Sequence, residues 1–273
     1  MRRLFLIAIL FAGCAHMPHE SFIEGPQGRL HVSDGGGGAG VPVVFVHGNG
    51  ANLTQWRAQL DHVRQTRRAV ALDLRGMGQS EPGRDGQYTP DAIADDIQAV
   101  ADALHLQRFV IVGHSFGGSV VAAYAAKHPE RVAGVVFADA AGVVKITPEV
   151  AEKFKAAIAA NKDAVVAQWF TPILENGREE TKKAVLDSVH NTPAEAFVGA
   201  LDSLRYFDVK QALDAYHGPR LAIAVVPLQN EASLNVQFPE IPTKTMDGVS
   251  HWLMMDKPDE FNALLDQFLT TIH

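Results

Sequence analysis

Cysteine, positive charge and long apolar runs are all scarce in this chain of 273 residues. Cys14 is the single cysteine, so the rest of the chain can supply neither a disulfide nor a thiol nucleophile. The formal net charge of −7 argues against a surface that neutralises nucleic-acid phosphates, and no apolar run reaches the roughly 20 residues of a membrane-spanning helix. With 47% hydrophobic and 20% charged residues, the composition is that of a globular protein with a sizeable core.

The first 14 residues have the layout of an export signal. Two arginines follow the initial methionine, a short apolar run comes next, and small residues precede Cys14. This order is typical of a secretory signal peptide. Residues 11–14 also resemble a bacterial lipobox, with Phe11 where leucine is usual, which implies a lipid on Cys14 and an envelope location in the periplasm or at the outer membrane. An ordinary cleaved signal, giving a secreted or periplasmic protein, is the alternative. We expect residues 15–21 to form a short tether.

Between residues 41 and 138, short apolar runs alternate with segments whose apolar residues recur at helical spacing. Such alternation predicts a parallel sheet with helices on both faces, the α/β class. An earlier strand-like run at 29–33 is followed by the glycine run 35–38, which we interpret as a hairpin loop leading to the next strand. Strands are expected at 41–46, 69–72, 109–112 and 132–138, and helices at 53–67, 90–106 and 115–127.

The alternation stops near residue 143, and a helix-rich stretch without strand-like runs extends to about residue 217. Strand character returns at 221–226 and, more weakly, at 243–246. A final helix is expected at 258–271.

The helix-rich stretch predicts a cap over one edge of the sheet. The cap would comprise residues 143–217, and the core would comprise residues 22–142 and 218–273. We expect most of the large apolar side chains of the cap to pack within it and a minority to line a pocket. These side chains are Phe154, Trp169, Phe170, Phe197, Tyr206 and Phe207.

The sharpest motif is Gly113-His114-Ser115-Phe116-Gly117, which fits G-x-S-x-G between an expected strand and an expected helix. Such a turn forces strained backbone angles on the serine, and small residues two positions before and after it keep neighbouring chains from clashing. The hydroxyl therefore stands exposed at the end of the strand, above a helix N-terminus whose dipole favours negative charge. The motif predicts that Ser115 is a nucleophile. A tight turn with an incidental serine is the alternative.

Acyl transfer also needs two N–H donors aimed at the oxyanion that develops on the carbonyl. The sequence His47-Gly48-Asn49-Gly50 follows the first long apolar strand. The backbone amides of Asn49 and Phe116 are the natural pair of donors, one from each loop. A glycine turn with a structural histidine is the alternative interpretation of the first loop. The sequence lacks a G-x-G-x-x-G fingerprint here, and no histidine–carboxylate cluster has metal-ligand spacing, so neither a dinucleotide nor a metal is expected.

These motifs resemble those of the α/β-hydrolase superfamily, in its capped esterase and peptidase-like branch. The resemblance covers residues 22–271. The turn that carries Ser115 is called the nucleophile elbow in this family. Members with aspartate at the elbow are dehalogenases or epoxide hydrolases, so Ser115 disfavours both activities. We interpret Asp73 and Arg75 as residues that structure their loop, not as catalysts. The segments that carry the resemblance are His47-Gly48, the loop at 73–80, Gly113–Gly118 and Val249-Ser250-His251-Trp252.

The resemblance implies that His251 is the base, because it lies between the last expected strand and the last helix and follows the serine in the usual order. His114 adjoins the nucleophile, and we expect its side chain to point away from the site. The carboxylate that would orient this histidine, the acid of the triad, is missing from its usual place. The loop at 227–231, after the strand that ordinarily precedes the acid, contains no aspartate.

Two carboxylates are candidates for the acid. Asp139 ends the strand after the elbow helix, where some superfamily members, including certain dehalogenases, carry theirs, and we favour it. Glu231 lies in the usual loop, and its longer side chain is a second route to His251. A Ser115–His251 dyad and Asp247 are the remaining alternatives, although Asp247 is close in sequence to the histidine it would orient.

The predicted function is hydrolysis of esters or related acyl compounds without an organic cofactor. Amide or peptide hydrolysis, carbon–carbon bond hydrolysis and cofactor-free peroxidation use similar constellations, because a fold does not fix its reaction. A non-catalytic binding protein that kept the fold is the rival from another class. The expected partner is a small-molecule acyl substrate, with no nucleic acid and with a membrane only through a lipid on Cys14.

Overall fold

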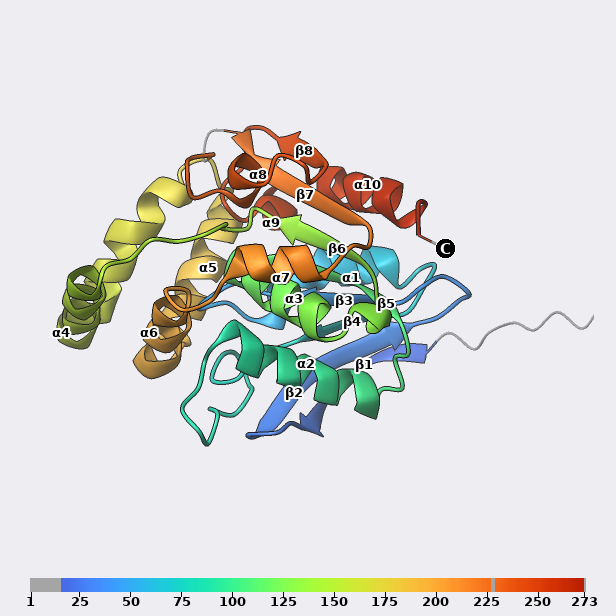
Figure 1. The fold of residues 1–273 in the computed structure, drawn as a ribbon, viewed down its shortest axis with the longest axis horizontal. Helices are drawn as coiled ribbons and strands as arrows, with labels where there is room; N and C mark the ends of the chain where they lie inside the picture. Colours follow the sequence, from blue (N-terminus) through green and yellow to red (C-terminus); the bar gives the residue numbers. More distant parts are fainter. Residues whose placement is uncertain (1–15, 227–228, 273) are drawn as a thin grey trace, which may run out of the picture.

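A mostly parallel sheet of eight strands forms the centre of the protein (Figure 1). The computed structural model describes residues 16–226 and 229–272. The strands lie in the order β1-β2-β4-β3-β5-β6-β7-β8, with β1 and β2 antiparallel to their neighbours and the others parallel. Their bounds are β1 His16–Glu24, β2 Arg29–Gly36, β3 Val43–Val46, β4 Ala69–Leu72, β5 Phe109–His114, β6 Val132–Ala138, β7 Arg220–Val225 and β8 Thr243–Met246.

Helices cover both faces of this sheet, as the continuous apolar strands predict. On one face, side chains such as Val44 and Ile111 pack with α2, α3 and α7. On the other, side chains of opposite parity such as Phe45 and Val112 pack with α1 and α10. The helices are α1 Arg57–Val63, α2 Pro90–Ala103, α3 Phe116–Lys127, α4 Pro148–Ile173, α5 Glu179–Asn191, α6 Ala194–Ser203, α7 Val209–Ala215, α8 Leu234–Gln237, α9 Leu253–Asp256 and α10 Pro258–Leu269.

The expected tether at 15–21 is wrong for the residues that the structure describes. Strand β1 begins at His16 and pairs antiparallel with β2 along the edge of the sheet. An edge strand has one face and one side open to solvent, so it tolerates polar residues and Pro18 that a central strand would exclude. Apolar patterning therefore gave no signal for this strand. Residue 15 and the expected signal segment lie outside the described residues.

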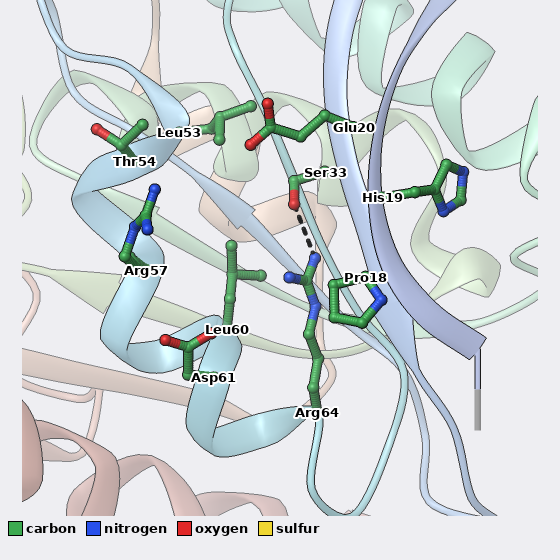
Figure 2. Close-up of a pocket in the computed structure, with 10 residues that line it drawn as sticks. All are labelled: Pro18, His19, Glu20, Ser33, Leu53, Thr54, Arg57, Leu60, Asp61 and Arg64. Carbon is green, nitrogen blue, oxygen red and sulfur yellow. Dashed lines mark hydrogen bonds between the residues drawn. The ribbon is translucent and has the colours of Figure 1, made fainter.

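A groove of about 420 Å³ lies where β1 and β2 meet η1 (Leu53–Trp56) and α1. Figure 2 shows Arg64 in this groove with its Nη2 donating to Ser33 Oγ at 3.0 Å. The same guanidinium donates to the carbonyl of Ala69. Arg64 thereby ties the end of α1 to the sheet. The groove shares no lining residue with the cavities around Ser115.

The interpretation of the glycine run 35–38 as a hairpin loop is also wrong. Strand β2 pairs antiparallel with β4, and β4 pairs on its other side with β3. All four residues of β3 are buried, so this strand requires a partner on each side and lies between β4 and β5. Gly35 and Gly36 therefore belong to β2, and the rest of the run leads to β3, which is not the neighbour of β2 in the sheet.

Four helices fill the sequence between β6 and β7, as the helix-rich stretch predicts. Helices α4, α5 and α6 lie beyond one end of the sheet (Figure 1). Helix α7 instead packs on α3, because Val209, Ala212 and Leu213 form an apolar face within the main core. The expected boundary of the insertion at residue 217 is thus one helix too late.

Helix α4 consists of two arms joined by a kink at Asn161, where φ is −160° and ψ is 88°. The Asn161 side chain accepts a hydrogen bond from Ala164 N and so caps the second arm. The kink brings Phe154 of the first arm against Trp169 of the second, with 4.6 Å between ring centroids. Two aromatic side chains distant in the helix thus form one wall. Within residues 16–226 and 229–272, no helix combines the length and the apolar character that crossing a membrane requires.

Candidate active site

Ser115 occupies the sharp turn between β5 and α3 and has the strained backbone that the motif predicts. Its φ is 53° and its ψ is −119°, a combination unfavourable for a residue with a side chain. The flanking glycines allow it: a β-carbon on Gly113 would lie 2.3 Å from Gly117 O, and one on Gly117 would lie 2.5 Å from His47 O. Backbone contacts this close exclude any larger residue at either position.

Asp139 and His251 form a close pair beside this turn. Nδ1 of His251 lies 2.6 Å from Oδ2 of Asp139, and their side chains are only 17% and 12% exposed. The other carboxylate oxygen, Oδ1, accepts a hydrogen bond from Val225 N at 3.1 Å. The Asp139 amide donates to Ile223 O. The carboxylate is therefore fixed by β7 and orients the imidazole so that Nε2 is free for proton transfer.

The order of the strands explains why the residue after β6 reaches this position. Parallel strands present their carboxyl ends at the same edge of the sheet, and β6 lies directly between β5, which carries Ser115, and β7. The two alternative acids are elsewhere. Glu231 is exposed, and its backbone carbonyl accepts a hydrogen bond from Gln237. The carboxylate of Asp247 is bound by the amide of Gly248.

The two expected oxyanion donors flank the serine. Phe116 is the first residue of α3, so its N–H has no acceptor within the helix. Asn49 lies in the loop after β3 and lines the same cavity as Ser115. Its side-chain Nδ2 donates to the carbonyl of Phe197 in α6, which holds the loop in place. No hydrogen bond joins Ser115 Oγ to the His251 ring, a contact that commonly tightens only when substrate is present.

A cavity of about 160 Å³ opens above Ser115 and His251 and extends under helices α4 and α6. Its walls are almost entirely apolar. Four of the six large apolar residues of the insertion line it, which is more than the minority expected, while Tyr206 is 73% exposed. The reason is the kink in α4, which turns both arms toward the serine. The aromatic members of the wall are Phe154, Trp169, Phe170, Phe197 and Trp252.

A second cavity of about 210 Å³ reaches Ser115 and His251 from the side of β6 and β7. It is lined by Asp139, by small alanine side chains and by the polar residues Asn230 and Ser233. The reacting pair therefore lies between an apolar cavity and a more polar one.

His114 contradicts its expected orientation. Its ring is buried, lies 4.7 Å from the His251 ring between centroids and lines the apolar cavity. A residue before the elbow points to the opposite face from the serine, but the loop carrying His251 folds over that face. This long-range contact has no signal in the local sequence. Sequence reasoning also missed Trp252 and Ile173, which line the site.

The loop after β4 is held by charged contacts, consistent with the interpretation of Asp73 and Arg75. Asp73 accepts hydrogen bonds from the amides of Leu53 and Gln79 and contacts His31 Nδ1 at 2.8 Å. Arg75 forms a two-pronged, buried ion pair with Asp96 at 2.6 and 2.7 Å. No group of three or more His, Cys, Asp or Glu residues in the described chain is arranged to hold a metal ion.

The sequence profile described as alpha/beta hydrolase fold matches residues 41–258. Over 127 residues the chain is 39% identical to a 2-hydroxymuconate semialdehyde hydrolase from Pseudomonas sp. (strain CF600), and this match spans 45% of the chain and only 44% of that relative. A protein of the same name from Pseudomonas putida is 26% identical, with 92% of this chain and 93% of the relative covered. A thermophilic esterase from Thermogutta terrifontis superposes with a TM-score of 0.80 at 23% identity, over 93% of this chain and 99% of that one.

The chain therefore belongs to the α/β-hydrolase fold family. This confirms the expected fold class and superfamily.

Proposed function

We propose that the protein hydrolyses esters with a compact apolar acyl group, using Ser115 as nucleophile, His251 as base and Asp139 as the acid that orients it. The observation that carries this proposal is the 2.6 Å contact between Asp139 and His251 beside the strained serine. Such a contact holds the imidazole in the tautomer that accepts a proton at Nε2 and stabilises the imidazolium that forms.

The reaction proceeds in two halves. Ser115 Oγ attacks the carbonyl carbon while His251 Nε2 takes its proton, and the carbonyl oxygen becomes an oxyanion that accepts hydrogen bonds from the amides of Asn49 and Phe116. The bond to the leaving oxygen then breaks, and His251 returns the proton to it. A water molecule next attacks the acyl-enzyme with His251 again as base. Ser115 leaves with its proton restored, and a carboxylic acid is released.

The linings of the two cavities favour an uncharged substrate. None of the described residues that line either cavity is a lysine or an arginine. An anionic substrate would lose its hydration on entering such a cavity and would find no cation to pair with. This loss of hydration costs free energy of binding. The second candidate is hydrolysis of a substrate like the 2-hydroxymuconate semialdehyde named for two relatives, and sequence similarity favours it. The absence of a cation in these linings makes the neutral ester the better match.

A fluorophosphonate probe tests the proposed nucleophile. Wild-type protein should be labelled on Ser115, and Ser115→Ala should not. The same substitution should reduce hydrolysis of a short-chain aryl ester by at least about a thousandfold, because removal of a triad nucleophile costs several orders of magnitude in kcat. Ser119→Ala is the matched control, because Ser119 is buried in α3 four positions away. Labelling that survives in Ser115→Ala would assign the reactive group elsewhere, and wild type that never labels would favour the binding protein.

Two further features belong to this proposal. Helices α4 and α6 act as a cap, since they supply most of the apolar wall above Ser115. The protein is exported and held at the envelope by lipid on Cys14, an inference that stands on the basic, apolar and small-residue order of residues 1–14.

A further inference from the structure

His114 is a buried histidine that the proposed reaction does not use. It is the last residue of β5 and is 1% exposed. Its Nε2 lies 2.9 Å from the backbone carbonyl oxygen of His251. A carbonyl oxygen can only accept, so Nε2 carries the hydrogen and Nδ1 carries the lone pair.

The other ring nitrogen faces the oxyanion loop. Nδ1 of His114 is buried and has no hydrogen-bond partner among the described residues. A β-carbon on Gly48 would lie 3.0 Å from it, so Nδ1 points at the residue that precedes Asn49. His114 thus fills the space between the loop that carries the base and the loop that carries an oxyanion donor.

Burial and the neighbouring rings keep His114 neutral. Loss of hydration lowers its pKa well below the usual value, and the nearby His251 and His47 rings act in the same direction. When His251 becomes an imidazolium during the reaction, the ring beneath it is therefore uncharged. A protonated neighbour 4.7 Å away between centroids would oppose that charge.

We propose that His114 is a positioning residue that holds the backbone of His251 through its neutral Nε2–H. His251 is then fixed from three elements: its carbonyl by β5, its ring by Asp139 after β6, and its amide by the Ile173 carbonyl at the end of α4. Asp139 determines the tautomer of His251, whereas His114 fixes the position of the His251 backbone. This inference rests on the proposed roles of Ser115 and His251.

Two substitutions separate the donor from the ring that carries it. His114→Gln keeps an N–H donor at the reach of Nε2, and His114→Met keeps apolar volume without a donor. We expect kcat to fall about ten- to hundredfold in His114→Met, with KM nearly unchanged, because small displacements of a reacting group are costly. His114→Gln should return kcat to within about threefold of wild type. Both variants should remain folded by circular dichroism and keep the acid limb of the pH–rate profile, because the Asp139 contact is intact.

A measurement on the wild-type protein makes the proposal independent of these variants. Nitrogen NMR of histidine-labelled protein should show one ring that stays neutral from pH 5 to 9 with its proton on Nε2, and that signal should disappear in either variant. Titration of the His114 ring in this range, or a proton on its Nδ1, would overturn the proposal. So would equal kcat in His114→Met and wild type, or equal losses in the Met and Gln variants. The NMR result does not depend on turnover, so failure of the proposed hydrolysis would be recognised separately.

Discussion

Oδ2 of Asp139 lies 2.6 Å from Nδ1 of His251, although 112 positions of sequence separate the two residues. Asp139 adopts this position with φ at 43°, a left-handed conformation that is strained for an aspartate. Two contacts with β7 hold it there, one through its amide and one through Oδ1. Backbone strain held in place by surrounding structure is common where a side chain must be aimed.

The first prediction concerns this acid. Asp139→Asn should reduce kcat by about a thousand- to ten-thousandfold, because an amide stabilises neither the productive tautomer nor the imidazolium. Glu231→Gln is the matched control and should stay within about threefold of wild type, since that side chain is exposed. Steady-state kinetics on one aryl ester, with thermal melts for both variants, measures the effect. A collapse of Glu231→Gln beside an active Asp139→Asn would return the acid to the loop after β7.

The second prediction concerns the apolar cavity. Val165 lines it from α4, so Val165→Phe should fill part of the space reserved for the acyl group. We expect kcat/KM for a hexanoyl ester to fall at least about tenfold, on the scale of the 1–3 kcal/mol that a misfit in an apolar pocket costs. The acetyl ester should be hydrolysed almost normally. Leu186→Phe, on the exposed side of α5, is the control for adding a ring to the same region. Parallel losses on both esters would mean that the acyl chain lies elsewhere.

The third prediction follows from a buried histidine outside the site. The hydrogen bond that His31 Nδ1–H donates to Asp73 raises the pKa of His31 against the opposing effect of burial, and the charges of Asp73 and Glu20 act in the same direction as the hydrogen bond. A raised pKa means that, as pH rises, the folded state still holds this proton after the unfolded state has released it. The resulting stability is complete below the unfolded value of about 6.5 and is lost as pH rises through the folded pKa.

His31→Gln should therefore destabilise the protein more at pH 6 than at pH 9. At pH 6 the loss should be about 1.5–3 kcal/mol, the usual scale for a hydrogen bond to a charged group. Urea unfolding at the two pH values measures it, and the exposed His217→Gln serves as control. A loss that is the same at both pH values would show that His31 is held as a neutral ring.

The fourth prediction concerns the envelope location. Cells that express the wild-type gene should carry the protein in the membrane fraction, and Cys14→Ser should release it to the soluble fraction. Several acyl chains on one cysteine hold a protein stably, whereas one chain holds it only marginally. Metabolic labelling with a fatty-acid analogue should mark wild type alone. Equal solubility of the two proteins would leave the signal peptide as an ordinary cleaved one.

Strands that are buried on both faces could be predicted closely from the sequence. The expected bounds of β4 and β6 agree with the structure to the residue, and the elbow at Ser115 has its expected strain. Local apolar patterning determines these features. It does not report which strands are neighbours, so β1 was mistaken for a tether and the glycine run for a hairpin. For the same reason the sequence left Asp139 and Glu231 as competing acids and misdirected His114. The acid and the orientation of His114 depend on contacts with His251, which lies 112 and 137 positions away in the sequence.

Attachment of Asp139 to β7 through backbone contacts has a consequence for engineering. Because the acid stands on a rigid strand end, the segment 229–233 carries no part of the proposed proton relay, yet Asn230 and Ser233 still border the polar cavity. Sequence diversity introduced at 229–233 should change which substrates are accepted while the His251–Asp139 pair keeps its geometry. Substrate preference and the geometry of the proton relay thus depend on different segments of the chain. A library confined to 229–233 can vary the first without disturbing the second.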